Sequence, residues 1–213
     1  PRSGTTLVES ILSSHDKVSS VGEINFLGNF VKSNFFKDNK ILLDDLHKFS
    51  GLNLKEEYFN YLESFNIKND VITDKSLENY FYLGFIKYFF PSSKLIHCQR
   101  NAKDNFLSIY KNLFTDNEAW KYDENELVEY YSLYKRIMNF WNKKISKDIL
   151  NINYEDLVKN NETTVKKIIN HCQLKWDEKC LNHYNYVAPI KTLSLNQANK
   201  PVYSSSIGSS NNY

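Results

Sequence analysis

The sequence predicts an α/β domain of three layers, in which helices flank a mostly parallel central sheet. Short apolar runs of strand length alternate along the chain with longer stretches whose apolar residues recur every three or four positions. That alternation is typical of parallel strands joined by helical crossovers. The 213 residues can bury one conventional core. We therefore expect a single domain over residues 1–213, with no internal repeat and no interdomain linker.

The first six residues, PRSGTT, predict a loop that leads into a helix. Leu7, Val8, Ile11 and Leu12 follow this loop at helical spacing. A loop of this kind normally follows a buried strand, and no strand precedes it in this sequence. We expect the sequence to be truncated at its N-terminus, without its first strand, and to be truncated at its C-terminus as well.

The remaining helices and strands are predicted from apolar periodicity and from turn residues. The expected helices cover residues 41–66, in two pieces split near Gly51, and residues 80–90, 103–113, 123–145 and 162–172. The expected strands cover residues 71–74, 94–98 and 149–153. Residues 66–70 are expected to form a turn, and the Ser- and Asn-rich tail after Pro189 is expected to be a loop.

Residues 123–145 give the strongest helical pattern. One face carries apolar side chains spaced by four and three positions, namely Leu127, Tyr131, Tyr134, Met138, Trp141 and Ile145. Such a stripe is typical of an amphipathic helix that packs on a core.

Composition and charge exclude two broad classes of protein. The formal net charge is only +2, whereas nucleic-acid-binding proteins usually carry a clustered basic face and a higher isoelectric point than the 8.4 of this chain. The most apolar stretch, residues 80–90, is interrupted by Gly84 and Lys87. No run therefore reaches the roughly 18 apolar residues of a membrane span, and we expect neither a nucleic acid nor a membrane span.

The cysteines and histidines predict no metal site. Cys98, Cys172 and Cys180 are an odd number at spacings unlike those of metal ligands, and the five histidines show no ligand spacing either. Such cysteines suit a reducing compartment. We expect a cytoplasmic protein, with a Cys172–Cys180 disulfide as the open alternative.

The opening loop is a candidate anion site. Backbone N–H groups around Ser3, Gly4, Thr5 and Thr6 can form an anion-binding nest, which the positive end of the helix dipole would support. The alternative is an ordinary helix cap, because Ser, Thr and Gly are common at helix starts. Loops that bind ATP or GTP place Lys after this Gly, so Thr5 argues against kinase and GTPase chemistry.

Four sequence blocks in order resemble one enzyme family. They are PRSGTT with LVESILSSH and VGE, HCQRNAKDNFLSIY (97–110), INYEDLV (152–158) and KPVYSSSIG (200–208). Together they resemble the sulfotransferases that use 3'-phosphoadenosine-5'-phosphosulfate (PAPS), and within them the tyrosylprotein-sulfotransferase-like branch, often found C-terminal to TPR repeats. The resemblance implies a P-loop-like fold and a metal-independent transfer of a sulfuryl group from PAPS to a hydroxyl, which leaves 3',5'-adenosine bisphosphate.

The resemblance also implies three catalytic residues. Sulfuryl transfer needs an in-line acceptor, charge stabilisation and a base. Arg2 and Lys75 match the cations that neutralise the transferring group, and Glu23 of VGE matches the general base. Without the resemblance, all three would be interpreted as solvated surface charges. His15, the base in other branches, is expected to have a structural role at the end of the first helix.

Further residues match the donor site of the family. Ser3, Gly4, Thr5 and Thr6, with Arg2, would hold the 5'-phosphosulfate. Arg100 and Ser108 would hold the 3'-phosphate, which ATP lacks. Tyr154 matches a residue near the adenine, with a plain core tyrosine as the alternative, and Ser194 matches a donor-contacting serine.

Three positions near these blocks are interpreted less specifically. Asp104 is expected to pair with Arg100 or to cap its helix. Relatives carry a basic residue just after Gly208, where this chain has Ser209 and Ser210, and the loss of one cation would weaken the hold on the 3'-phosphate.

Two rival functions and several open questions remain at this stage. A nucleotide-dependent phosphotransferase would need ATP and Mg²⁺, and a non-catalytic nucleotide-binding module would bind the donor without turnover. The hydroxyl acceptor is not identified, because similar cores act on protein tyrosine, carbohydrate and small molecules. A homodimer is compatible with the sequence.

Overall fold

The computed structural model describes residues 1–38, 40–42, 51–65, 67, 69–112, 114, 119–186 and 200–212. The α-helices are α1 (Thr5–Ser13), α2 (Phe26–Phe35), α3 (Gly51–Leu62), α4 (Leu83–Phe89), α5 (Ala102–Tyr110), α6 (Glu124–Lys144), α7 (Tyr154–Lys159) and α8 (Asn161–His171). The strands are β1 (Val18–Ser20), β2 (Phe36–Lys37), β3 (Lys40–Ile41), β4 (Val71–Thr73), β5 (Leu95–Gln99) and β6 (Ile149–Asn153). Short 3₁₀ segments include η3 (Leu77–Tyr82), η4 (Ala119–Lys121), η5 (Glu178–Asn185) and η6 (Ser209–Asn212).

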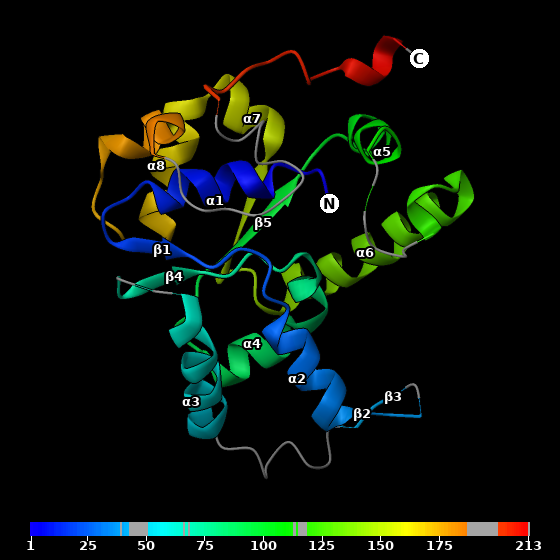
Figure 1. Ribbon diagram of the computed structural model, residues 1–213. Coiled ribbons are helices and arrows are strands. Elements are labelled where there is room, and N and C mark those ends of the chain that lie inside the picture. Colours follow the sequence, from blue (N-terminus) through cyan, green and yellow to red (C-terminus); the bar gives the residue numbers. More distant parts are fainter. Residues whose placement is uncertain are drawn as a thin grey trace.

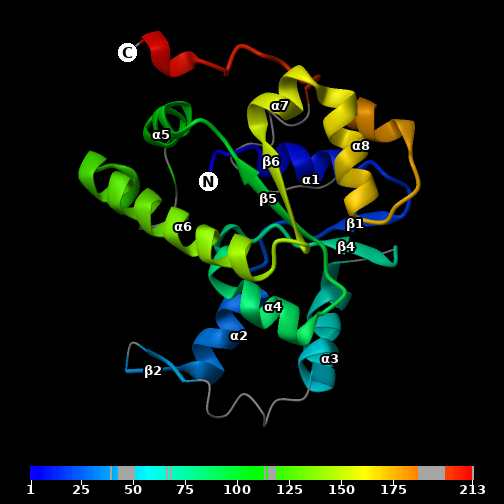
Figure 2. The ribbon, with the colours of Figure 1, turned by 180° about the vertical axis from the view of Figure 1, so that it is seen from behind.

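Helices lie on both sides of the strands, which confirms the predicted α/β layers (Figures 1 and 2). In the view of Figure 1, α1, α5, α7 and α8 lie above the strands, and α2, α3 and α4 lie below them. The main strand pairs are parallel. Val18 of β1 lies opposite Val71 of β4, and Leu95 of β5 lies opposite Ile149 of β6.

The central sheet differs from the single sheet that we predicted. Within the described residues the strands form two parallel pairs, β1 with β4 and β5 with β6, and a separate antiparallel hairpin of β2 with β3. No backbone ladder joins β4 to β5 in that part of the chain. A cavity of about 920 Å³ is lined by residues of both strands, among them Thr73 and Cys98.

Most predicted elements are present, with shifted ends. The strand over 149–153 is β6, the strand over 71–74 is β4, and the strand over 94–98 is β5, one residue further along. The helix over 123–145 is α6, and the side chain of Asp123 caps it by accepting hydrogen bonds from the backbone N–H groups of Asn125 and Glu126. Backbone amides at a helix start need such an acceptor.

Other elements depart from the prediction. The stretch 80–90 divides into η3 and α4, so its first turns are 3₁₀ rather than α-helical. Of residues 41–66, the second expected piece is α3, whereas residues 43–50 and 66 lie outside the described residues. The predicted helix 103–113 is α5, which ends at Tyr110. The strand β1 and the helix α2 were not predicted.

The core holds α1 in place, and with it the opening loop. Ile11 of α1 is fully buried and belongs to one apolar cluster with Val165 and Ile168 of α8. On the other side of the strands, Phe35 and Phe89 belong to a second cluster, rich in aromatic side chains. Burial of such side chains stabilises the fold by about 1.5–3 kcal/mol each.

The three cysteines are free thiols, and Cys180 is buried. The alternative of a disulfide between Cys172 and Cys180 is therefore wrong. Among the described residues, no helix combines the length and the apolar character needed to cross a bilayer.

Candidate functional site

The opening loop takes a conformation that only glycine accommodates at its fourth position. Gly4 is the N-cap of α1, with φ +94°, a region that L side chains rarely adopt. A Cβ added there would lie 2.7 Å from Cδ2 of Tyr154. Tyr154 at the start of α7 thus packs directly on the loop. Because Gly4 has no Cβ, this ring fits against the loop beside the N-terminal amides of α1.

The end of β5 and the helix α5 hold this loop from the other side. Asn105 donates from Nδ2 to the carbonyl of Pro1 over 2.9 Å. Arg100 donates from Nη1 to the carbonyl of Arg2 over 3.3 Å, and Nε of Arg2 donates to Oγ of Ser108 over 3.0 Å. Residues about a hundred positions apart therefore meet at the first turn of α1.

Two guanidinium groups lie close together here. Burial and the neighbouring Arg100 lower the pKa of Arg2. The Arg100 guanidinium also lies over the ring of Tyr154, 4.8 Å from its centroid, and its Nε is buried with no hydrogen-bond partner among the described residues. Two neighbouring cations at a helix N-terminus favour an anion in the space between them.

A second cluster of charges centres on Lys75. Its Nζ forms an ion pair with Oε1 of Glu23 and lies 3.7 Å from Oε2 of Glu9. The Lys75 and Glu9 side chains are 9% and 2% exposed, whereas Glu23 is 35% exposed. The backbone N–H of Lys75 donates to the carbonyl of Gly22 over 2.9 Å, which brings the end of β4 to the segment that carries Glu23.

Glu9 is a site residue that the sequence analysis missed. Ser20 donates from Oγ to its Oε1 over 2.5 Å, and burial raises the pKa of Glu9. No apolar pattern pointed to it, because residue 9 lies outside the arc of Leu7, Val8, Ile11 and Leu12 on a helical wheel. Its burial is set by the tertiary fold, which supplies Ser20 and Lys75 as polar partners.

The structure brings five of the eleven predicted site residues to one cavity. Ser3, Thr5, Glu23, Lys75 and Arg100 all line the cavity of about 920 Å³. Arg2 bonds to Ser108, so it lies with the residues expected to hold the 3'-phosphate. Thr6 is buried in α1. Ser194 lies outside the described residues.

The structure shows the contacts of two further residues, His15 and Asp104. His15 is buried and structural, because the backbone N–H of Lys17 donates to its Nδ1 and its Nε2 lies 2.9 Å from the carbonyl of Lys175. Asp104 does not cap α5, since Asn101 accepts from the first amides of that helix. Its carboxylate instead accepts hydrogen bonds from the backbone N–H groups of Gly208 and Ser210.

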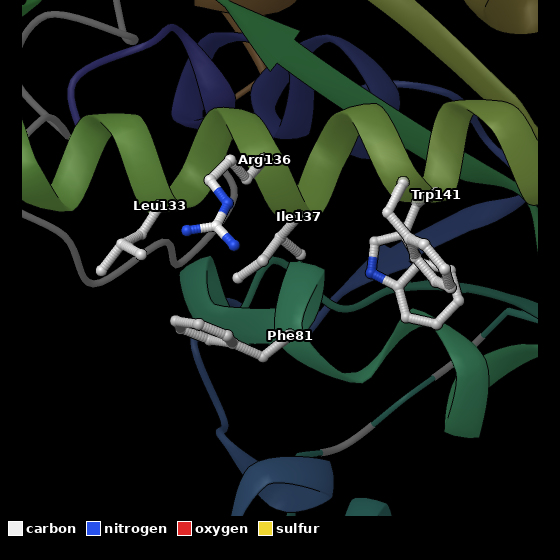
Figure 3. A pocket seen from close by; sticks show the side chains of 6 residues that line it. Phe81, Leu133, Arg136, Ile137 and Trp141 are labelled. Atoms are coloured by element: carbon white, nitrogen blue, oxygen red, sulfur yellow. The ribbon is translucent and has the colours of Figure 1, made fainter.

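A second hollow lies between α6 and η3 and is mostly apolar (Figure 3). It measures about 410 Å³, and its lining comprises Phe81, Leu133, Arg136, Ile137, Phe140 and Trp141. It contains none of the predicted site residues. No group of three or more His, Cys, Asp or Glu side chains suited to a metal ion occurs in the described part of the chain.

Three comparisons relate this chain to known proteins. The model of the sulfotransferase family matches residues 1–178. A protein of Aquifex aeolicus (strain VF5), described as uncharacterized, is 29% identical over 219 aligned positions, which cover 97% of this chain and 29% of that protein. The sulfotransferase domain of the Synechococcus PCC 7002 olefin synthase has the same fold, with a TM-score of 0.70 at 18% identity over all of this chain and 85% of that one.

Proposed function

This chain belongs to the sulfotransferase family, and on that premise we propose that it transfers a sulfuryl group from PAPS to a hydroxyl group. The observation that carries the proposal is the pairing of two unlike charge clusters around one cavity. Arg2 and Arg100 leave positive charge at the start of α1, and the Glu23–Lys75 ion pair faces the same cavity.

The donor site would use the first cluster. The N-terminal amides of α1 and the hydroxyls of Ser3, Thr5 and Thr6 would hold the 5'-phosphosulfate. Arg100 and Ser108 would hold the 3'-phosphate, with Arg2 between the two anionic groups because it already bonds to Ser108. Tyr154, which packs against Gly4 and under Arg100, would contact the adenine.

The transfer step would use the second cluster. As the acceptor oxygen attacks the sulfur in line, Glu23 takes the proton of the acceptor hydroxyl. The bond from sulfur to the phosphate oxygen breaks, and 3',5'-adenosine bisphosphate leaves with that electron pair. Lys75 neutralises the negative charge that develops on the transferring group. The products are a sulfate ester and the bisphosphate, and no metal takes part.

The proposal also covers the acceptor, the cellular compartment and the oligomeric state of the protein. The partial exposure of Glu23 suits a macromolecular hydroxyl such as a protein tyrosine or a carbohydrate, and the branch proposed is the tyrosylprotein-sulfotransferase-like one. The chain spans 29% of the length of the Aquifex relative, so the activity, substrates and partners of a longer protein are proposals as well. We place the protein in the cytoplasm and leave open a homodimer.

We further propose that residues 1–213 form one domain whose sheet takes up an additional strand between β4 and β5. Each of these strands pairs on one side only within the described residues, and Thr73 and Cys98 line the cavity between them. Joining an apolar strand to Pro1 is then expected to raise the melting temperature.

The donor assignment is tested by comparing how much two nucleotides raise the melting temperature of the protein. We expect 3',5'-adenosine bisphosphate to raise the melting temperature strongly, because a ligand that binds only the folded state stabilises it. ATP with Mg²⁺, which lacks the 3'-phosphate, is expected to raise it little. The reverse order would contradict the proposal and favour a phosphotransferase.

A further inference from the structure

The last described segment lies across the proposed donor site. Residues 200–212, here called the C-terminal strap, pass from α7 towards α5 on the face that carries the start of α1 (Figures 1 and 2). Ser206 is the point of contact. Its carbonyl accepts from Nη2 of Arg100 over 2.6 Å, and its Oγ lies 2.7 Å from the hydroxyl of Tyr154.

One buried carboxylate holds the strap just beyond this contact. Asp104, in the first turn of α5, is 2% exposed. Its Oδ2 accepts from the N–H of Gly208 over 2.7 Å, and its Oδ1 accepts from the N–H of Ser210 over 2.8 Å. Gly208 adopts φ +70°, so the strap turns around the carboxylate at this residue.

Asp104 does not cap its own helix. Asn101 caps α5 by accepting from the backbone N–H groups of Lys103 and Asp104. Arg100, which directly follows β5, faces the carboxylate as a charged group, and its own Nη2 bonds to the strap. Without the strap, a buried carboxylate would lose its two backbone donors, which is costly in an environment that excludes water.

We propose that Asp104 is a positioning residue that anchors the strap over the donor, so that Ser206, Arg100 and Tyr154 together close the nucleotide pocket. The inference rests on the proposed function. It also accounts for Ser209 and Ser210, which occupy the positions where the resemblance implies a cation. Here the strap contributes backbone N–H groups to Asp104, and its bond to Arg100 orients a cation from the residue after β5 instead.

The direct test is Asp104→Asn, compared with Asp123→Asn. Both carboxylates accept two backbone N–H groups, but Asp123 caps α6, away from the strap. We expect Asp104→Asn to speed hydrogen exchange at the amides of Gly208 and Ser210, and to weaken the binding of 3',5'-adenosine bisphosphate about tenfold, as for the loss of one charge-assisted hydrogen bond. Asp123→Asn is expected to change neither quantity.

The strap side offers a second variant that leaves Asp104 intact. Ser210→Pro removes the N–H that donates to Oδ1 of Asp104. We expect the same loss of affinity as for Asp104→Asn, and a double variant little worse than either single one, because both changes break one contact. If Asp104→Asn fails to fold, Ser210→Pro still decides the question. In transfer assays the KM for PAPS should rise by a similar factor with kcat little changed.

The outcomes separate this inference from the proposed function. If the wild-type protein binds the bisphosphate and Asp104→Asn binds it equally well, the proposed role of the anchored strap in donor binding is wrong, even if the strap exchanges faster. If unchanged exchange accompanies unchanged affinity, Asp104 does not hold the strap at all. If the wild-type protein does not bind the bisphosphate, the proposed function fails and the donor role of the strap fails with it, whereas the exchange data still establish or refute the anchor.

Discussion

The two charge clusters of the site differ in how their charge is balanced. At the start of α1, Nε of Arg2 donates to a hydroxyl and Arg100 donates to two backbone carbonyls, and the Asp104 carboxylate faces Arg100 from α5. Around Lys75, one ammonium group faces the two carboxylates of Glu9 and Glu23. The first cluster keeps positive charge for an anionic ligand, whereas the second pairs its charge internally and keeps a carboxylate available for proton transfer.

The largest expected effect separates the two clusters most sharply. Glu23→Gln removes the proposed base and leaves the donor cluster untouched. We expect sulfate transfer from labelled PAPS to fall about a hundredfold or more, and binding of 3',5'-adenosine bisphosphate to stay as in the wild type. Glu162→Gln is the matched control, because Glu162 forms an exposed ion pair with Lys166 on α8. Transfer that survives Glu23→Gln unaltered would refute the base assignment.

The next effect acts on the other cluster. Arg100→Ala removes a cation and its bonds to Arg2 and Ser206, so we expect binding of the bisphosphate, measured by calorimetry, to weaken about tenfold to a hundredfold. Arg136→Ala is the control, since Arg136 lines the separate hollow on α6 (Figure 3). Equal affinities for the two variants would remove Arg100 from the donor site.

A smaller effect tests the packing that links the loop to α7. Gly4→Ala and Gly22→Ala both place a side chain at positive φ, +94° and +70°, but only Gly4 would also bring a Cβ within 2.7 Å of Tyr154. We expect Gly22→Ala to cost about 1 kcal/mol of unfolding free energy and Gly4→Ala to cost more. Denaturant titration measures the difference. Equal losses of unfolding free energy in the two variants would mean that the Tyr154 ring moves aside at no cost in stability.

The smallest effect concerns the pH dependence of Glu9. Because burial raises its pKa above the ordinary 4.5, the folded state favours the protonated carboxyl, and its contribution to stability is present below pH 4.5 and lost as the pH rises through the folded pKa. Glu9→Gln resembles the protonated form. Its melting temperature relative to the wild type should therefore be higher at neutral pH than at pH 4, and a difference independent of pH would contradict the assignment.

The fold was predictable where one element carries its own signal. The helix α6 has five apolar positions on one face and an aspartate cap, and three of the five residues of β6 are apolar, so local sequence sufficed for both. The strand β1 has three residues, two of them serines, and α2 contains Gly28, which packs against Tyr82. The conformation of β1 depends on β4, which is distant in sequence, and no local pattern reveals it. In α2, by contrast, Leu27, Phe30 and Val31 recur at helical spacing, a signal that the prediction missed.

The residues of the site were likewise predictable in some cases and not in others. The resemblance supplied Arg2, Glu23 and Arg100 as candidates because each lies in a motif, and it supplied Lys75 by its place after the predicted strand over 71–74. For Asp104, the expected interaction with Arg100 is present, but the expected helix cap is wrong because Asn101 caps α5. Its backbone partners Gly208 and Ser210 were not predicted, since they are over a hundred residues away. Contacts of that range are set by the tertiary fold.

The central claim is that the donor cluster and the Lys75 cluster act on one sulfuryl group. Its most direct measurement is the release of 3',5'-adenosine bisphosphate from PAPS carrying labelled sulfate, with pools of protein, carbohydrate and small hydroxyl acceptors. The account predicts bisphosphate release coupled one to one with label in an acceptor, and loss of both in Glu23→Gln. Tight binding of the bisphosphate with no labelled product in any pool would contradict it and indicate a nucleotide-binding module without transfer chemistry.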